Sequence, residues 1–279
     1  MECEICSSKT SLFGSAVLLN KHRIQYFRCD SCGFLQTEKP YWFQEAYCEA
    51  IARTDVGLVS RNFMFSEITQ TLIRGFFDSN GKFLDYGGGY GLLVRIMRDK
   101  GFDFYWHDKW CNNLFAKTFE VSQAGTNAFE LLTAFEVFEH LSHPLAELTE
   151  MLRFSKNILF STELLPVQAP PLGQWPYYSL EHGQHVSFYT RSSLHALAKR
   201  LDVNLYSDGR LLHLFTEKKI SSFAFRLFSL YPMARFLNLF QGRKSLSERD
   251  YKEAIKSLNR RSDAGEEGAT NESKTARER

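Results

Sequence analysis

A short glycine-rich segment combines a backbone that can bend sharply with acidic side chains. Residues 85–91 read Asp-Tyr-Gly-Gly-Gly-Tyr-Gly, and Asp108 follows the next apolar stretch, residues 102–106. Because glycine carries no Cβ, such a turn lets the backbone come close to a ligand. The two carboxylates, Asp85 and Asp108, suit a ligand that carries ribose hydroxyls, an ammonium and a sulfonium.

The same segment lacks the features that phosphate-binding turns need. A dinucleotide fingerprint requires Gly-x-Gly-x-x-Gly. Gly87 and Gly89 fit that pattern, but Leu92 occupies its sixth position. A P-loop requires a lysine beside the turn, and residues 83–91 contain no cation. The turn is therefore poorly suited to anionic phosphates, which disfavours a nicotinamide-dependent enzyme.

The residues on either side of the turn predict the elements that hold it. Residues 82–84 have the character of a buried strand, and residues 92–97 carry apolar side chains at helical spacing. A strand, a glycine turn and a helix in succession open a nucleotide-type α/β domain. The alternative is a turn that only packs a helix on a strand and binds no ligand.

The pattern Asp-x-Gly-x-Gly-x-Gly, with an acidic residue at the end of the second strand, resembles the Rossmann-like S-adenosylmethionine-dependent methyltransferases. The resemblance implies that Gly87, Gly89 and Gly91 approach the methionine part of S-adenosyl-L-methionine. It also implies that Asp85 helps to hold the ammonium group and that Asp108 bonds the ribose.

Four of the six cysteines have the spacing of a metal site. Cys3 and Cys6 form one Cys-x-x-Cys pair, and Cys29 and Cys32 form a second pair 22 residues later. Four thiolates at this spacing suit a tetrahedral Zn²⁺, and so short a segment needs a metal for its stability. Two disulfides are disfavoured because the chain opens without a secretory signal. A redox motif is disfavoured because no strand precedes Cys3.

A second constellation begins at the end of the predicted fourth strand, where residues 135–140 read Phe-Glu-Val-Phe-Glu-His. Ligands bind beyond the carboxyl ends of the strands in a parallel sheet. Glu136, Glu139 and His140 are therefore expected to face the same cleft as the glycine turn. His185 follows the predicted fifth strand and belongs to the segment expected to cover this cleft.

The string Glu-Val-x-Glu-His-x-x-x-Pro resembles a large branch of these methyltransferases, including the ubiquinone-pathway O-methyltransferases. The small-RNA 2′-O-methyltransferases pair a Glu-x-x-Glu-His string with a later histidine to hold a divalent cation. Residue by residue, the resemblance implies that Glu136, Glu139, His140 and His185 hold Mg²⁺ or Mn²⁺, which such donors suit. Two alternatives stay open: His140 or His185 acts as a general base without a metal, or the four residues are structural.

Strand and helix patterns alternate through the middle of the chain. The predicted strands are 82–86, 103–107, 118–121, 129–135, 157–162, 203–207 and 211–216. The predicted helices are 90–100, 144–154 and 191–202, the last capped by Thr190. This order predicts an α/β fold whose mostly parallel sheet is covered on both faces. Residues 207–210 predict an antiparallel final hairpin, which is the Rossmann-like methyltransferase arrangement that the resemblance implies.

Five parts of the chain are expected. They are a zinc ribbon at residues 1–40, a helical connector at 41–80, the S-adenosylmethionine-binding methyltransferase domain at 81–218, a helical C-terminal extension at 219–256 and a disordered tail at 257–279. The tail contains one leucine and no aromatic residue, so it has too little apolar surface to fold.

Composition and charge narrow the class of protein. The 279 residues are 44% hydrophobic and carry a net charge of +2, which gives no whole-protein field for nucleic acid. An acidic start without an apolar run predicts a cytoplasmic protein. The Phe- and Leu-rich residues 221–240 are interrupted by Arg226, Pro232 and Arg235, which excludes a membrane span. We expect a helix pair that packs on the domain; the alternative is contact with a membrane surface or a partner.

Further matches extend the resemblance to bacterial methyltransferases with an N-terminal zinc ribbon. They include Cys29-x-x-Cys32-Gly33 and the strings at residues 40–42 and 55–62. Members of that group act on sugars or secondary metabolites, so the resemblance implies O-methylation of a small-molecule or sugar-linked acceptor, with or without a divalent cation. The alternative is a non-catalytic zinc-ribbon scaffold with a degenerate methyltransferase domain, which the intact glycine turn argues against.

Overall fold

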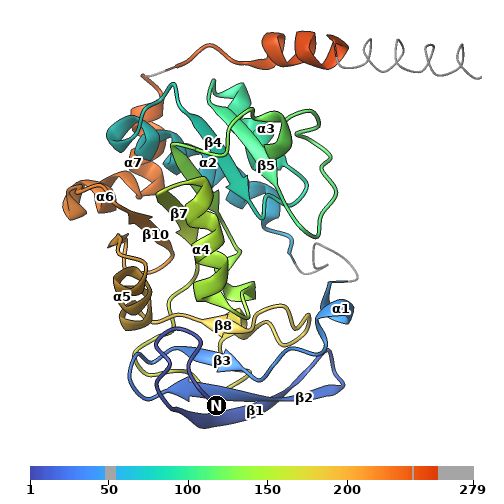
Figure 1. Cartoon of the computed structure of the whole chain (residues 1–279), viewed down its shortest axis with the longest axis vertical. Coiled ribbons are helices and arrows are strands. Elements are labelled where there is room, and N and C mark those ends of the chain that lie inside the picture. The colour runs from blue at the N-terminus through green and yellow to red at the C-terminus, as the bar shows by residue number, and fades with distance from the viewer. Residues whose placement is uncertain (48–54, 241, 257–279) are drawn as a thin grey trace, which may run out of the picture.

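Two β-sheets organise the molecule, a central sheet and a smaller one at the N-terminal end (Figure 1). The structure is a computed structural model that describes residues 1–47, 55–240 and 242–256. The predicted tail at 257–279 and residues 48–54 of the predicted connector lie outside the described residues. Nothing in the described part of the chain forms a helix long and apolar enough to cross a membrane.

The central sheet is mostly parallel. Its strands are β4 (Lys82–Tyr86), β5 (Asp103–His107), β6 (Leu131–Ala134), β7 (Asn157–Ser161), β9 (Asn204–Ser207) and β10 (Leu212–Thr216). They lie in the order β5-β4-β6-β7-β10-β9, with β10 antiparallel to both of its neighbours. All residues of β6, β7 and β10 are buried, as expected for strands covered on both faces. The predicted α/β fold with a final antiparallel hairpin is confirmed.

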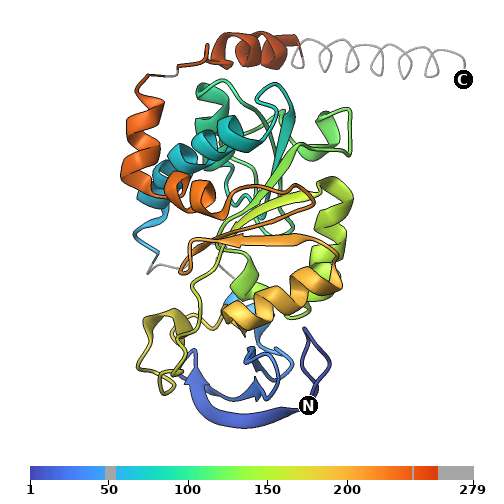
Figure 2. The same cartoon turned by 90° about the vertical axis from the view of Figure 1, so that its left-hand side faces the viewer.

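Helices cover both faces of this sheet (Figures 1 and 2). One face is covered by α2 (Leu58–Phe76), α3 (Leu92–Asp99) and α6 (Ser222–Phe228), with α7 (Tyr231–Asn238) packed against α2. The other face is covered by α4 (Pro144–Phe154) and α5 (Arg191–Arg200). Thr190 caps α5, as predicted, in a reciprocal capping box with Ser193.

One predicted strand is wrong. Residues 118–121 form only an isolated bridge, in which Glu120 pairs with Trp106, and a short 3₁₀ helix η1 (Val121–Gln123) follows. Thr118 has φ +75°, a left-handed conformation that a β-branched residue adopts only in a turn. Only Phe119 and Glu120 remain between this turn and η1, which is too few residues for a strand.

The N-terminal sheet contains a strand that the sequence did not indicate. Its strands are β1 (Thr10–Leu18), β2 (His22–Cys29), β3 (Leu35–Thr37) and β8 (Ser187–Phe188), in the order β1-β2-β3-β8 and all antiparallel. The first three come from the segment predicted to be a zinc ribbon. β8 comes from the long segment between β7 and α5, so the ribbon and the central domain share one sheet.

Short elements join the two sheets. They are α1 (Phe43–Ala46), η2 (Phe138–His140) and η3 (Pro176–Tyr178). Trp42, just before α1, is buried, and its indole Nε1 donates to the carbonyl of Gly183 at 2.8 Å. The chain that leaves the ribbon is therefore anchored to the loop that precedes β8.

The C-terminal extension is fastened to the edge of the central sheet. Arg98 of α3 is fully buried, and its guanidinium pairs with Asp250 at 2.7 Å and with Asp103 at 2.7 Å. Asp250 belongs to a helix at residues 247–256. The bidentate geometry of arginine with a carboxylate gives this contact directional specificity.

Candidate functional site

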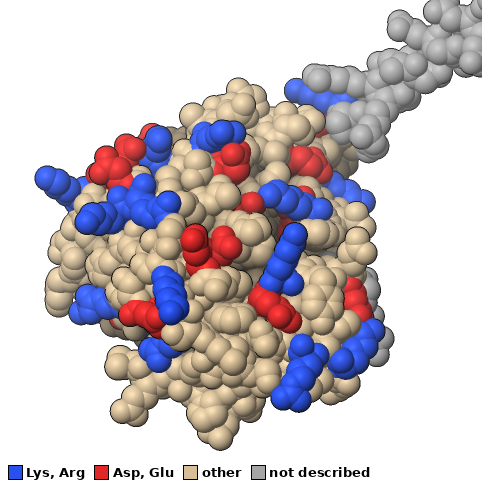
Figure 3. Space-filling model, turned by 60° about the horizontal axis from the view of Figure 1, so that its bottom comes forward, with Lys and Arg blue, Asp and Glu red and all other residues tan. Residues whose placement is uncertain are grey.

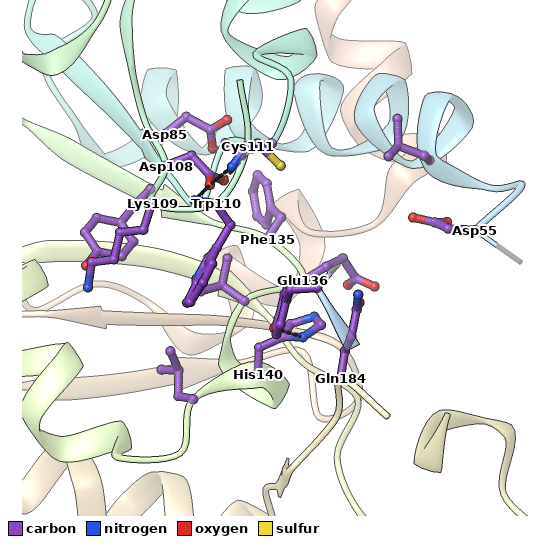
Figure 4. A pocket seen from close by; sticks show the side chains of 18 of the residues that line it. Asp55, Asp85, Asp108, Lys109, Trp110, Cys111, Phe135, Glu136, His140 and Gln184 are labelled. Carbon is purple, nitrogen blue, oxygen red and sulfur yellow. Dashed lines mark hydrogen bonds between the residues drawn. The ribbon is translucent and has the colours of Figure 1, made fainter. Parts of the chain in front are cut away.

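A cavity of about 790 Å³ lies at the carboxyl ends of β4, β5 and β6. Ligands of open parallel sheets bind at this edge. The glycine turn and Asp108 line one part of it, and Glu136, His140 and His185 line another. Figure 4 shows Asp85 and Asp108 on one side of Phe135, with Glu136 and His140 on the other. The two constellations predicted from the sequence thus share one cavity.

The glycine turn needs glycine for two different reasons. Gly87, Gly89 and Gly91 all have positive φ, between 54° and 86°, a region that strains other residues. A Cβ at Gly87 would also lie 2.6 Å from Val137 Cγ2, whereas a Cβ at Gly89 would meet no atom within 4 Å. Gly87 is therefore required for packing, and the space over Gly89 is open to a ligand.

Asp85 lies at the base of the turn and is buried. Its Oδ1 accepts a hydrogen bond from Thr133 Oγ1 at 2.7 Å. Burial raises the pKa of this carboxyl to about 7, because desolvation disfavours the charged form. A ligand ammonium beside Asp85 would favour ionisation and be held by it.

Asp108 is fixed by backbone donors. Its Oδ2 accepts from Gly89 N at 2.9 Å, and its Oδ1 accepts from Trp110 N at 2.6 Å and Cys111 N at 2.8 Å. A carboxylate offers about four acceptor positions, so these three bonds orient the group and leave a position free. That geometry is compatible with the ribose contact implied for Asp108.

Three of the four residues implied to hold a cation come together. Donor atoms of Glu139, His140 and His185 all lie within 4.8 Å of one another. Glu139 is fully buried, and neither carboxylate oxygen has a hydrogen-bond partner among the described residues. An unpaired buried carboxyl is costly, so this site offers a cation a carboxylate that has no other partner.

Glu136 lies outside this group of three. It has φ +55°, its Oε1 accepts from Ser161 Oγ at 2.7 Å, and its Oε2 lies 3.8 Å from Arg61 Nε. Arg61 in turn pairs with Asp55 at 2.7 Å. Glu136 is thus the middle of a charged chain on the cavity wall, and burial raises its pKa.

The two histidines of the group are held as neutral imidazoles. Burial lowers the pKa of His140 to about 4 and holds the pKa of His185 well below its ordinary value. His185 Nδ1 lies 2.7 Å from the carbonyl oxygen of Tyr177. Since a carbonyl only accepts, Nδ1 carries the proton and Nε2 keeps its lone pair. That nitrogen can bind a metal or accept a proton.

Four further side chains belong to the cavity although the sequence predicted no role for them. Tyr47 donates to or accepts from His140 Nδ1 at 2.9 Å, and its ring stacks on Trp110 with centroids 5.2 Å apart. Arg61 orients Glu136, and His182 has a buried Nδ1 without a partner among the described residues. Tyr47 and Arg61 come from the predicted connector. Arg61 lies in the string at 55–62 that extends the resemblance, but a single aromatic or basic residue there does not reveal its role.

The cysteines lie together at the N-terminal end of the molecule. Sγ–Sγ distances are 3.7 Å for Cys3 with Cys32, 3.4 Å for Cys6 with Cys29 and 3.6 Å for Cys6 with Cys32. Zinc–sulfur bonds of about 2.3 Å in a tetrahedron place sulfurs about 3.8 Å apart. The four thiols therefore fit a closed zinc site.

Hydrogen bonds connect the cysteine cluster to the histidine segment. Thr190 Oγ1 donates to the carbonyl of Cys32 at 2.7 Å, and Thr37 N of β3 donates to Val186 O at 3.0 Å. Val186 N donates to the carbonyl of Glu139 at 2.8 Å. His185 therefore lies on a strip of chain held between the ribbon and the end of β6.

Fold and cavity together define a class I S-adenosylmethionine-dependent methyltransferase, and comparison with known proteins agrees. A family model described as "Methyltransferase domain" matches residues 60–207. This span is more than half of the chain, and the protein belongs to that methyltransferase-domain family. No curated protein sequence matches the chain significantly.

Several solved methyltransferase structures resemble this chain at low sequence identity and low TM-score. The plantazolicin methyltransferase BpumL in complex with SAH is 11% identical with a TM-score of 0.42, covering 62% of this chain and 94% of that one. The magnesium protoporphyrin IX methyltransferase ChlM from Synechocystis PCC 6803 with bound SAM is 12% identical with a TM-score of 0.38, covering 62% and 89%. CalO1, a methyltransferase in calicheamicin biosynthesis, is 14% identical with a TM-score of 0.42, and this chain spans 60% of it.

Proposed function

We propose that this methyltransferase acts on a hydroxyl group of a small-molecule or sugar-linked acceptor, and that Glu139, His140 and His185 hold a divalent cation beside that hydroxyl. The observation that carries the proposal is the buried, unpartnered carboxyl of Glu139 next to two neutral imidazoles. Carboxylate oxygens and imidazole nitrogens suit Mg²⁺, Mn²⁺ or a similar ion.

The donor side of the cavity positions the methyl group. S-adenosylmethionine, when bound, supplies an electrophilic methyl on its sulfonium. Asp85 would hold the ammonium, the open backbone at Gly89 would lie against the methionine part, and Asp108 would fix the ribose. Holding two reactants in line supplies up to about 7–11 kcal/mol of the barrier, so we expect positioning to be the main contribution of these residues.

The acceptor side prepares the hydroxyl. A cation held by Glu139, His140 and His185 would bind the hydroxyl oxygen and lower its pKa. Tyr47 orients His140, and the Tyr177 carbonyl orients His185. The second candidate is general-base catalysis by His185 without a metal, favoured by its free Nε2; a positioned base contributes about 10²–10⁴-fold.

Surface charge favours a small acceptor over a nucleic acid. On the face that carries the ribbon, Lys and Arg are interspersed with Asp and Glu (Figure 3), and the net charge of the chain is +2. Nucleic-acid-binding proteins concentrate Lys and Arg in a patch or stripe. The cavity volume is within the range of small-molecule sites.

The cation proposal is tested by binding Mn²⁺ and by metal-dependent turnover. Wild type is expected to bind one Mn²⁺ in the cavity, and Glu139→Gln is expected to lose it. Glu181→Gln, a substitution on the cavity wall outside the group of three, is the matched control. In a methyl-transfer screen on sugar-linked and other small acceptors, EDTA should remove activity and Mg²⁺ or Mn²⁺ should restore it. Activity that resists EDTA but is lost in His185→Ala would replace the cation with a histidine base.

We further propose that Cys3, Cys6, Cys29 and Cys32 bind one structural Zn²⁺. All four positions are protein thiols, which leaves no open coordination position for catalysis. Elemental analysis of protein purified without added metal should find one zinc per chain. Retention of full zinc by a Cys29→Ser chain would contradict this assignment.

A further inference from the structure

The outer face of α6 and α7 exposes large apolar side chains. Phe223, Leu230, Phe236, Leu239 and Phe240 are 54–77% exposed. Arg226 and Arg235 are the exposed charged residues between them. We call these seven residues the α6–α7 face; Figures 1 and 2 show both helices on the outside of the layer that contains α2.

The surface helix α5 gives a comparison for the solvent-facing side of a helix in this protein. The exposed positions of α5 are Arg191, Ser192, His195, Lys199 and Arg200, all polar. Single exposed apolar residues need no explanation, but a contiguous set on one element marks an interaction surface. Both surfaces are exposed to solvent, but α5 presents polar side chains whereas the α6–α7 face presents mostly Phe and Leu.

The inner side of the same helices is fully used in packing. Phe225 and Ala234 are buried, and the ring of Phe228 packs on Phe76 with centroids 5.6 Å apart. Asn238 Nδ2 donates to the carbonyl of Glu67 of α2 at 2.9 Å. The prediction that this helix pair packs on the domain is thus confirmed for its inner side. No described element covers its outer side.

The chain segment that carries this face has charged residues of one sign. From Lys218 to Ser247 the chain has six Lys or Arg residues and no Asp or Glu. At the end of α7, Arg235, Arg243 and Lys100 line a shallow cavity of about 310 Å³ beside Leu239. Glu67 also lines it, but its carboxylate is engaged by Lys100 and by Asn238. The exposed charged groups of the α6–α7 face itself are therefore cationic, and they lie beside exposed apolar side chains.

We propose that the α6–α7 face docks on an anionic lipid surface. Phe and Leu side chains enter the boundary between headgroups and acyl chains, and arginines at the same level meet lipid phosphates. Two short helices carrying Phe, Leu and Arg on one side match this mode of binding. A protein interface is favoured less, because every charged residue from 218 to 247 is basic, and charge of a single sign is complementary to anionic headgroups. This proposal does not depend on the identity of the acceptor.

The test uses the full chain and vesicles of defined composition. We expect co-flotation with vesicles of phosphatidylcholine and phosphatidylglycerol at 7:3, weak binding to pure phosphatidylcholine, and loss of binding in high salt. Phe236→Ser with Phe240→Ser should lower the bound fraction at least tenfold. Each of Arg226→Gln and Arg235→Gln should lower the partition coefficient about fivefold.

Matched controls come from exposed residues elsewhere. Val167→Ser, an apolar residue that is 95% exposed, and Arg191→Gln on α5 should leave vesicle binding unchanged. Equal binding of wild type and the Phe236→Ser, Phe240→Ser variant would overturn the proposal, as would no binding to anionic vesicles. A concentration-dependent dimer that the same variant abolishes, without vesicle binding, would overturn it in favour of a second copy of this chain.

Discussion

In the proposed function one half of the cavity binds the methyl donor and the other half binds the acceptor, and these two halves are built in opposite ways. The donor half comes from two nearby pieces of chain, residues 85–91 and Asp108, at the ends of two neighbouring parallel strands. The acceptor half combines Tyr47 after α1, Glu139 and His140 after β6, and His185 on a strip held by the ribbon. We therefore expect local backbone geometry to determine donor binding, and contacts between distant segments to determine acceptor chemistry.

Loss of the proposed zinc site should separate the behaviour of the two halves most strongly. In Cys29→Ser the ribbon loses the stability that a structural zinc supplies, about 10–16 kcal/mol in zinc-finger peptides. Because β3 pairs with β8, amide exchange at residues 183–190 should accelerate by orders of magnitude. Affinity for S-adenosylmethionine should change little, since no hydrogen bond joins the glycine turn to the ribbon within the described part of the chain.

Hydrogen exchange measures the opening of residues 183–190, and calorimetry on the same preparation measures the affinity for S-adenosylmethionine. Ser31→Ala, an exposed position between the two cysteines of the second pair, is the control and should behave as wild type. A parallel loss of S-adenosylmethionine affinity in Cys29→Ser would show that the two halves are one cooperative unit.

Gly87→Ala should have the second-largest effect, confined to the donor half. The new Cβ would lie 2.6 Å from Val137 at φ +69°, so the turn must distort. We expect binding of S-adenosylmethionine to weaken by more than tenfold, measured by calorimetry. Gly125→Ala has a similar φ of +65° but meets no atom within 4 Å; it reports the conformational strain alone and should keep normal affinity.

Asp108→Ala should weaken the binding of S-adenosylmethionine by a moderate amount. It removes the acceptors implied for the ribose, so we expect a loss of roughly 1–3 kcal/mol in binding free energy. Asp108→Asn keeps one acceptor oxygen and should fall between wild type and Ala. Thermal melts of the ligand-free proteins separate lost ligand contacts from lost folding, because Asp108 also holds the amides of Trp110 and Cys111. Unchanged affinity in both variants would remove Asp108 from the site.

The smallest effect concerns pH. Burial raises the pKa of Asp85 to about 7, and the ionised form is the one that holds an ammonium. Below pH 7 the free protein must lose a proton before it binds, so affinity should rise with pH up to about 7, by at most about tenfold per pH unit. Asp85→Asn should bind more weakly and lose this slope. A wild-type profile that is flat from pH 6 to 8 would contradict the role of Asp85.

The same contrast explains how much the sequence could predict. The strand, glycine turn and helix, the α/β sheet and its final hairpin follow from local patterns, and the structure has them. For the acceptor half, the sequence predicted the glutamate and histidine residues of the two motif strings but not how they are arranged. Glu136 and Glu139 are three residues apart in one string, yet φ +55° at Glu136 turns it toward Ser161 while Glu139 points to the histidines. No periodicity in the sequence signals such a reversal.

Two other features depend on tertiary contacts that no short pattern encodes. β8 has two residues, too few for a recognisable alternation, and it is a strand only because β3 lies beside it. Tyr47 contacts His140 across 93 residues of sequence. Conversely, the predicted strand at 118–121 has suitable residue types, but the left-handed conformation of Thr118 and the 3₁₀ helix that begins at Val121 leave too few extended residues between them.

The most direct test of a separate donor half and acceptor half is a crossed pair of titrations. Gly87→Ala and His185→Ala are each titrated with S-adenosylmethionine and with Mn²⁺. The account predicts that Gly87→Ala loses S-adenosylmethionine but keeps Mn²⁺, and that His185→Ala loses Mn²⁺ but keeps S-adenosylmethionine within about twofold. If one variant loses both ligands, or if His185→Ala binds Mn²⁺ as wild type does, the division of the cavity into these two halves is wrong.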